Sequence, residues 1–201
     1  MNETHLITAI VLAAGLSRRM GRAKLLLPLE GHAVIRVTVE RVLASGIPRV
    51  VVVIGPEARE LEEALAGLPV TFAVNPSPEA GQASSIRTGI QALPHEAEAA
   101  LIVLGDQPFL AAEVIPSLLA ARRIAATAIV APRYLDGRGN PVLFGSEMFP
   151  ELLELSGDQG ARSIIGRDPG RVTLVDFNVP MPADVDTPED YGKLRSPDNT
   201  V

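Results

Sequence analysis

The sequence contains no cysteine among its 201 residues. Disulfide scaffolds, thiolate-bound zinc, iron–sulfur clusters and cysteine nucleophiles are therefore excluded. Tryptophan is also absent and aromatic residues make up only 3% of the chain, which leaves few rings to stack on single-stranded bases. No apolar run approaches the roughly 20 residues that a membrane-spanning helix needs.

Basic residues are outnumbered, with 18 Lys and Arg against 24 Asp and Glu, so the formal net charge is -6. A general electrostatic attraction to nucleic acid or to an anionic membrane needs the opposite balance. Residues 1–8 carry no Lys or Arg ahead of the short apolar run 9–14, so the basic region of a secretory signal is missing. We therefore expect a soluble, cytoplasmic protein with neither nucleic acid nor membrane as a partner.

Hydrophobic residues make up 47% of the chain, which is ample for a buried core. Short, β-branched, continuously apolar runs alternate with segments of helical period, and this alternation is typical of βαβ units around a parallel sheet. The expected strands are residues 8–12, 50–54, 70–74, 100–104, 128–131 and 172–175. The pattern predicts an α/β fold of three layers, with a Rossmann-like, mainly parallel sheet and helices on both faces.

Three apolar stripes at helical spacing lie between the expected strands. They are Ile35, Val39, Val42 and Leu43, which Gly46 could cap; Leu61, Leu65 and Leu68; and Val114, Ile115, Leu118 and Leu119. No repeat, low-complexity segment or charged linker interrupts the chain, so we expect one domain over residues 1–201. The glycine-rich segment 133–169 breaks the rhythm, with short helices expected near 148–155 and 161–166. It is either an elaboration that carries a second substrate or loop decoration.

The loop after the first strand concentrates positive charge in an acidic protein. It runs from Leu12 to Lys24 and contains Arg18, Arg19 and Arg22, with Gly15 and Gly21 allowing a ligand to approach the backbone closely. Open α/β sheets bind ligands at the carboxyl ends of their strands, so this loop suits a polyphosphate. Its glycine spacing matches neither a P-loop nor the dinucleotide fingerprint. The alternative is that its cations are merely solvated.

Two acidic residues, far apart in the chain, are candidates for one metal site. Asp106 follows the fourth strand, where a carboxylate can hold Mg²⁺ against phosphate oxygens, although a Gly-Asp pair is also a common turn. Near the end of the chain, Thr187 and Asp190 are explained by capping of a helix that starts at Pro188. Capping leaves Asp186 unexplained, so we expect Asp106 and Asp186 to hold the same ion.

A third segment, residues 78–89, follows the third strand and enters a helix. Gly81 gives access to the backbone, and the hydroxyl groups of Ser84 and Ser85 can donate or accept hydrogen bonds from a base or ribose. Capping of the helix by a serine is the structural alternative.

Taken together and in this order, these motifs resemble the MobA-like nucleotidyltransferases. Within that family the chain is most similar to the branch of the molybdenum cofactor cytidylyltransferases, and the resemblance covers residues 7–194. It rests on the Leu-Ala-Ala-Gly-x-Ser-x-Arg-Met-Gly-x-x-Lys loop, Gly-Gln-Ala-Ser-Ser-Ile-Arg, Leu-Gly-Asp-Gln-Pro and Asp-Val-Asp-Thr-Pro-Glu-Asp.

The resemblance implies Mg²⁺-dependent transfer of CMP from CTP to the phosphate of Mo-molybdopterin, giving molybdopterin cytosine dinucleotide and pyrophosphate. Mn²⁺ would also suit an all-oxygen site. It further implies transient contact with molybdenum hydroxylases or their chaperones. Ala14 stands where the guanylyl-transferring branch has glycine, which favours CTP. The implied roles are catalysis for Arg18, Lys24 and Asp106; metal binding for Asp106 and Asp186; and nucleotide binding for Leu12, Ala13, Ala14, Gly15, Lys24, Gly81, Ser84 and Ser85.

The chain departs from this pattern on the acceptor side. Gln82 stands where relatives commonly carry methionine, and Asn140 replaces the histidine of a Gly-His-Pro-Val stretch, whereas the segment 157–162 does resemble the acceptor-side loop. Two other interpretations stay open: a nucleotidyltransferase for a sugar phosphate or other small phosphate, and a non-catalytic chaperone that binds the nucleotide or cofactor.

Overall fold

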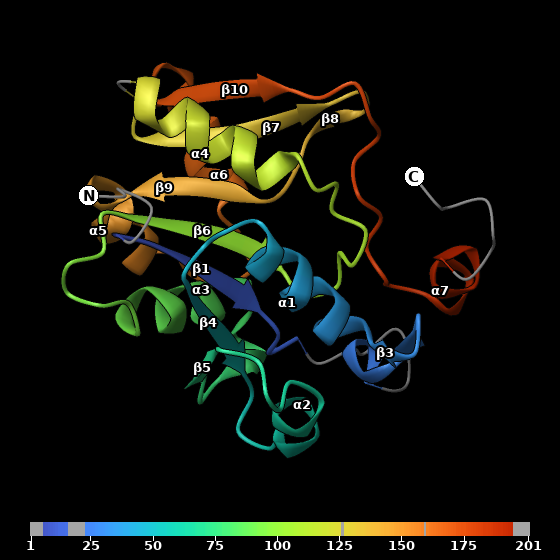
Figure 1. Ribbon diagram of the computed structural model, residues 1–201. Helices are drawn as coiled ribbons and strands as arrows, with labels where there is room; N and C mark the ends of the chain where they lie inside the picture. The colour runs from blue at the N-terminus through green and yellow to red at the C-terminus, as the bar shows by residue number, and fades with distance from the viewer. Residues whose placement is uncertain (1–5, 16–22, 126, 159, 195–201) are drawn as a thin grey trace.

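A single twisted sheet organises the chain in the computed structural model, which describes residues 6–15, 23–125, 127–158 and 160–194 (Figure 1). Its strand order is β10-β7-β9-β6-β1-β4-β5, and β8 pairs with β7. The strands are β1 (Ile7–Leu12), β4 (Arg49–Ile54), β5 (Thr71–Val74), β6 (Ala99–Leu104), β7 (Ile129–Tyr134), β8 (Gly137–Arg138), β9 (Val142–Gly145) and β10 (Val172–Asp176). All six strands predicted from the apolar runs are confirmed.

The sheet is mainly parallel, as predicted. The central strand β1 pairs in parallel with β4 on one side and β6 on the other, and β5 continues the parallel set. The short strand β9 runs antiparallel to both β6 and β7, and β8 runs antiparallel to β7. The carboxyl ends of β1, β4, β5 and β6 therefore lie at the same edge of the sheet.

The glycine-rich segment 133–169 turns out to contribute a strand to the middle of the sheet, so it is more than loop decoration. Its strand β9 is buried along its whole length between β6 and β7. A four-residue run among glycines carries little signal of its own, because the neighbouring strands supply its hydrogen bonds. The two short helices predicted there are confirmed as α5 (Phe149–Leu153), preceded by the 3-10 turn η4 (Ser146–Met148), and α6 (Arg162–Arg167).

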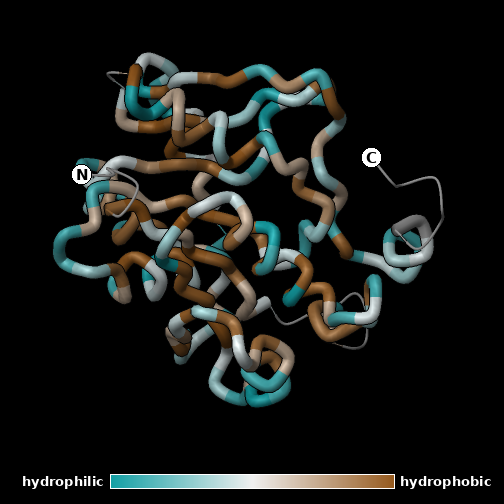
Figure 2. The backbone as a smooth tube through the Cα atoms, viewed as in Figure 1, coloured by the Kyte–Doolittle hydropathy of each residue, from teal (hydrophilic) through white to brown (hydrophobic). Residues whose placement is uncertain are grey.

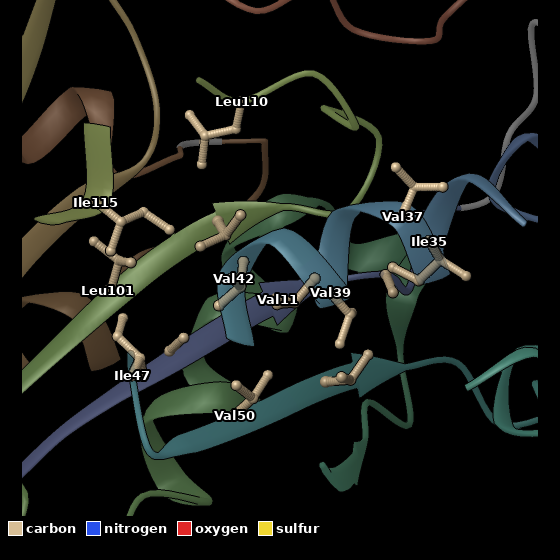
Figure 3. Close-up of a cluster of buried hydrophobic side chains, with 14 of the residues drawn as sticks. Val11, Ile35, Val37, Val39, Val42, Ile47, Val50, Leu101, Leu110 and Ile115 are labelled. Carbon is tan, nitrogen blue, oxygen red and sulfur yellow. The ribbon is translucent and has the colours of Figure 1, made fainter. Parts of the chain in front are cut away.

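Helices cover both faces of the sheet and complete three layers. One face packs under α1 (Val34–Ala44), α2 (Arg59–Ala64) and α4 (Val114–Ile124), and the other under α3 (Gln82–Gln91), α5 and α6. Figure 3 shows Val39 and Val42 of α1 above Val11 of β1 and Val50 of β4. The predicted stripes of α1 and α4 are thus confirmed as the buried sides of these helices. The middle stripe lies only partly in α2: Leu61 is half-buried in the helix, whereas the buried Leu65 and the half-buried Leu68 follow its last residue.

Alternate residues of each central strand enter different cores, because successive side chains of a strand point to opposite faces. In β1, Ala9 and Val11 pack under α1, whereas Ile10 packs under α3. Both faces are therefore apolar, and Figure 2 shows hydrophobic (brown) backbone along the central strands of the sheet. This arrangement is the physical reason for the continuous apolar runs in the sequence.

The end of the described chain packs beside a small hairpin near its beginning. The hairpin pairs β2 (Pro28–Leu29) with β3 (His32–Ala33), and the Tyr191 hydroxyl of α7 (Pro188–Leu194) donates to the carbonyl of Pro28. The predicted cap of α7 is confirmed, since Thr187 and Asp190 exchange backbone-to-side-chain hydrogen bonds. The remaining 3-10 turns are η2 (Lys24–Leu26), η3 (Pro78–Ala80) and η5 (Pro169–Arg171).

In the part of the chain that the structure describes, no helix combines the length and apolar character needed to cross a membrane.

Candidate active site

A cavity of about 490 Å³ opens beyond the carboxyl ends of β1 and β6. This is the edge where open α/β sheets bind ligands, and the volume falls in the range of small-molecule sites. Five stretches that are far apart in the sequence contribute its walls, namely 12–15 with 24–25, 78–85, 104–106, 158 and 184–186. They supply Leu12, Ala14, Gly15, Lys24, Leu25, Pro78, Glu79, Gly81, Gln82, Ser85, Leu104, Asp106, Asp158, Asp184 and Asp186.

The turn after β6 approaches β1 closely because residue 105 is glycine. The Gly105 N–H donates to the carbonyl of Leu12 at 3.0 Å, and the hydroxyl of Thr38 donates to the Gly105 carbonyl at 3.0 Å. A Cβ at this position would lie 2.8 Å from the Leu12 oxygen and 2.9 Å from Ile35 Cδ1, closer than real contacts allow. Glycine therefore lets the backbone place Asp106 beside the end of β1.

Lys24 joins the two acidic segments that the sequence singled out. Its Nζ donates to the carboxylate of Asp106 and to Asp186 Oδ1 at 2.7 Å. The Lys24 and Asp106 side chains are mostly buried, at 14% and 17% exposure, whereas that of Asp186 is 41% exposed. Burial by itself would lower the pKa of Lys24, but the charge of Asp106 and the hydrogen bonds to both carboxylates outweigh it and raise that pKa.

The paired carboxylates have the chemistry of a site for a hard divalent cation. Asp106 and Asp186 present oxygen atoms to one cationic group, the Lys24 ammonium. No group of three His, Asp or Glu side chains among the described residues is arranged to hold a metal ion. Mg²⁺ usually takes only one or two protein carboxylates and completes its shell with phosphate oxygens and water. The residues present therefore fit a metal that arrives with a phosphate ligand.

Asp184 and Gln107 belong to the same site and were not predicted. Gln107 is almost fully buried, and its Nε2 donates to Asp184 Oδ1 at 2.6 Å. Partial burial of the Asp184 carboxyl group, and then the charge of nearby Asp106, raise its pKa above its ordinary value. The available signal was the Asp-Val-Asp spacing: in extended chain, residues 184 and 186 share a side while Val185, fully buried, faces the core.

The loop containing Asp158 packs tightly against the start of α3. Gly81 has a φ of +89°, and a Cβ there would lie 2.4 Å from the carbonyl oxygen of Gly157. That same oxygen accepts a hydrogen bond from the Ala83 N–H at 3.1 Å. A side chain at position 81 would push the loop away, so glycine allows Asp158 to form part of the cavity wall.

The two predicted serines have different positions. The buried Asn75 side chain donates to the hydroxyls of both Ser84 and Ser85, at 2.8 and 3.0 Å. Ser85 lines the cavity, whereas the Ser84 hydroxyl donates back to the Gly81 carbonyl at 2.8 Å and stabilises the first turn of α3. The Ser84 hydroxyl is therefore used within the protein, although not as a cap, since the N-cap of α3 is Gly81 and no side chain caps this helix; Ser85 faces the site.

The residues that follow β1 likewise differ in whether they line the cavity. Leu12, Ala14 and Gly15 line the cavity, whereas the side chain of Ala13 packs into the core under α1. The predicted catalytic residue Arg18 lies outside the described residues, as do Arg19 and Arg22.

Comparison with known proteins identifies the class of this fold and site. Residues 9–172 match the MobA-like NTP transferase domain, so the chain belongs to this nucleotidyltransferase family. It is 32% identical to the purine catabolism protein PucB of Bacillus subtilis, covering 97% of this chain and 98% of that protein. It is 25% identical to the molybdenum cofactor cytidylyltransferase of Escherichia coli, covering 92% and 93% of the two chains.

Solved structures of similar sequence share the fold of this chain. The crystal structure of Rv0371c from Mycobacterium tuberculosis has a TM-score of 0.81 and 34% identity, covering 94% of this chain and 96% of that one. A structure of Rv0371c in complex with manganese has a TM-score of 0.79 and 32% identity, covering 94% and 97%.

Proposed function

We propose that this protein transfers CMP from CTP to the terminal phosphate of Mo-molybdopterin and releases pyrophosphate. The observation that carries the proposal is the convergence of Asp106 and Asp186 on the Lys24 ammonium inside a ligand-sized cavity. Membership of the nucleotidyltransferase family supports the reaction class. The likeness to a cytidylyltransferase along nearly the whole chain supports both CTP and the molybdopterin acceptor.

A second relative that matches along nearly its full length supports the same acceptor. PucB is named for purine catabolism. The cytosine dinucleotide cofactor serves hydroxylases of the xanthine dehydrogenase type, and xanthine is a purine. A cytidylyltransferase that supplies this cofactor would therefore serve purine oxidation.

The chain's own residues would bind and orient the nucleotide. Leu12, Ala14 and Gly15 offer a small, smooth wall for the base, and Ser85 offers a hydroxyl for base or ribose. Lys24 would neutralise charge on the triphosphate, with Arg18 as a second cation. The N-terminus of α3 also faces the cavity through Gly81 and Gln82, and its dipole favours negative charge there.

The chemical step needs positioning and charge neutralisation more than covalent help. An oxygen of the acceptor phosphate forms a bond to the α-phosphorus of CTP as the bond between that phosphorus and the pyrophosphate oxygen breaks. A phosphate monoester is ionised near neutral pH, so no residue has to remove a proton. We accordingly assign no catalytic role to His5, His32 or His95.

Asp106 and Asp186 would hold the divalent cation, Mg²⁺ or Mn²⁺. Such an ion neutralises phosphate oxygens and stabilises the charge that develops in the transition state. The manganese complex of Rv0371c, a structure of the same fold at 32% identity, supports a divalent ion here.

The acceptor would enter from the side formed by the loop of Asp158. This loop forms part of the cavity wall and belongs to the segment 133–169, which we propose as the acceptor side of a single domain. Its packing on Gly81 would couple acceptor binding to the nucleotide side.

The test is pyrophosphate release by the purified protein with Mg²⁺, CTP and Mo-molybdopterin. Release with this acceptor, and little with sugar phosphates under the same conditions, is expected. Turnover with a sugar phosphate alone would show that the acceptor is not Mo-molybdopterin. CTP binding without any turnover would favour a non-catalytic, nucleotide-binding chaperone.

A further inference from the structure

We propose that Gln107 is a positioning residue that holds Asp186 at a fixed separation from Asp106. It does so by anchoring the segment 182–186 to the turn that follows β6. The proposal rests on the proposed function for the role of the two aspartates as metal ligands, but the anchoring itself is a property of the chain alone.

The segment that carries Asp186 has no regular structure of its own. Residues 177–187 form neither helix nor strand, so no ladder of backbone hydrogen bonds fixes them along their length. Asp106, in contrast, directly follows a central strand whose turn is tied to β1 through Gly105. Besides the contacts of Lys24 and of α7, the separation of the two carboxylates therefore depends on the contacts that fasten the irregular segment to the turn after β6.

Gln107 provides that fastening from inside the protein. Its side chain is only 2% exposed, and its Nε2 donates to Asp184 Oδ1 at 2.6 Å and to the Pro182 carbonyl at 3.4 Å. A buried amide that loses its partners pays a desolvation penalty, so the two acceptors are held against it. One side chain thus contacts two points of the segment just ahead of Asp186.

A backbone contact makes the anchoring measurable. The Val185 N–H donates to the carbonyl oxygen of Asp106 at 3.1 Å, and Val185 is fully buried. This hydrogen bond lies between Asp184, which Gln107 holds, and Asp186, which faces Lys24. Protection of the Val185 amide from exchange with solvent therefore reports whether the segment 182–186 is packed against the turn after β6.

Asp184 is better explained as the hydrogen-bond acceptor of Gln107 than as a third metal ligand. Its Oδ1 is engaged by the glutamine, and no three-membered group of ligating side chains is found in the described residues. Removal of either partner should loosen the same contact. The two single variants and their combination should then be equivalent rather than additive.

The experiment compares Gln107→Leu, Asp184→Ala and the double variant with the unmodified protein. Hydrogen exchange of the Val185 amide is followed by NMR without metal or nucleotide, and the affinity for Mn²⁺ is measured separately. We expect faster Val185 exchange in all three variants, to a similar extent. We also expect Mn²⁺ affinity to fall about 10- to 100-fold, as for other residues that orient a ligand.

Two further variants separate positioning from simple loss of a buried amide or of charge. Asn75→Ala removes a buried amide that bonds Ser84 and Ser85 on another element, and it should leave Val185 exchange unchanged. Asp184→Asn keeps an oxygen that can accept from Gln107, and it should retain slow exchange. If Gln107→Leu does not fold, Asp184→Ala breaks the same contact at an exposed residue and decides the question.

Val185 exchange as slow in Gln107→Leu and Asp184→Ala as in the unmodified protein would overturn the anchoring. Faster exchange with unchanged Mn²⁺ affinity would overturn its link to the metal site. Absence of Mn²⁺ binding by the unmodified protein would instead contradict the metal site of the proposed function. The exchange data would still decide whether Gln107 anchors the segment 182–186.

Discussion

Lys24 and Asp186 are separated by 162 positions in the chain, yet Lys24 Nζ donates to Asp186 Oδ1 at 2.7 Å. The same ammonium group also contacts Asp106, so one positive charge balances two carboxylates. Without a cation between them, these like charges would repel each other. Lys24 thus keeps the acidic pair together and stands where a divalent ion would compete with it.

The first prediction concerns Lys24→Met, which keeps the length of the side chain and removes the charge. Turnover should fall about 100-fold or more, because a cation aimed at the developing charge is lost. Affinity for Mn²⁺ in the absence of nucleotide should rise, because the competing ammonium is gone. Pyrophosphate release and metal titration check the two effects. Arg59→Met, which removes an exposed cation of an i,i+4 pair, should change neither. Weaker Mn²⁺ binding in Lys24→Met would contradict the competition.

The second prediction uses the raised pKa of Asp184. Because the folded state raises this pKa, Asp184 favours folding most when protonated, below its ordinary pKa of 3.8, and that contribution is lost as the pH rises through the folded-state pKa. The ionised carboxyl group therefore costs stability at neutral pH, and Asp184→Asn should be the more stable protein there.

This stability difference should shrink as the pH falls through the raised pKa of Asp184, and it should vanish well below the ordinary pKa of 3.8, where the carboxyl group is neutral in both the folded and the unfolded protein. Urea unfolding at several pH values measures it. Glu57→Gln, at an exposed position away from the cavity, controls for the change in net charge. A difference that does not depend on pH would rule out the titration of Asp184 as its source.

The third prediction compares two glycines that both have a positive φ but differ in the space around the missing Cβ. Gly67 has a φ of +82° with open space around its missing Cβ, whereas Gly81, at +89°, faces the Gly157 carbonyl. Gly67→Ala should cost about 1–2 kcal/mol through backbone strain alone. Gly81→Ala should cost about 1–3 kcal/mol more, through overpacking and through the strain of a φ of +89° combined with a ψ of 179°, and it should also weaken CTP binding. Chemical denaturation and nucleotide titration test both. Equal losses of stability would show that the loop of Asp158 does not press on Gly81.

The fourth prediction tests which residue determines the preference for the cytosine base. Ala14 lines the cavity, so Ala14→Gly removes a methyl group from the wall and should reduce the preference for CTP over GTP, by up to about 10-fold. Its neighbour Ala13 packs into the core, so Ala13→Gly should lower stability and leave the nucleotide preference unchanged. The ratio of kcat/KM for the two nucleotides measures the effect. If Ala13→Gly alters this ratio more than Ala14→Gly does, Ala14 is not the residue that contacts the base.

The strands and helices could be predicted from the sequence because they depend mostly on local patterns of residues. Strands covered on both faces must be apolar throughout, and Ala9, Ile10 and Val11 illustrate this by entering two different cores. Helix α7 was likewise predicted from its Thr187–Asp190 cap, which needs only four residues of context. The strand β9 escaped notice because β6 and β7, distant in the chain, stabilise it.

The candidate site was predicted in outline and not in detail. The carboxyl-edge position brings together Lys24, Asp106 and Asp186, as their places after strands and near the chain end indicated. The pairing of Lys24 with both acids was not foreseen, because it depends on how segments 82 and 162 positions apart pack in space. The same holds for Gln107 and Asp184, whose contact no local pattern encodes.

The most direct test of nucleotidyl transfer at this site is pyrophosphate release by Asp106→Asn, which keeps the shape of the side chain and removes its charge. Release from CTP in the presence of Mo-molybdopterin and Mg²⁺ should fall by at least about 100-fold, with the unfolding transition of the variant retained. Release at the wild-type rate by the folded Asp106→Asn protein would contradict the account.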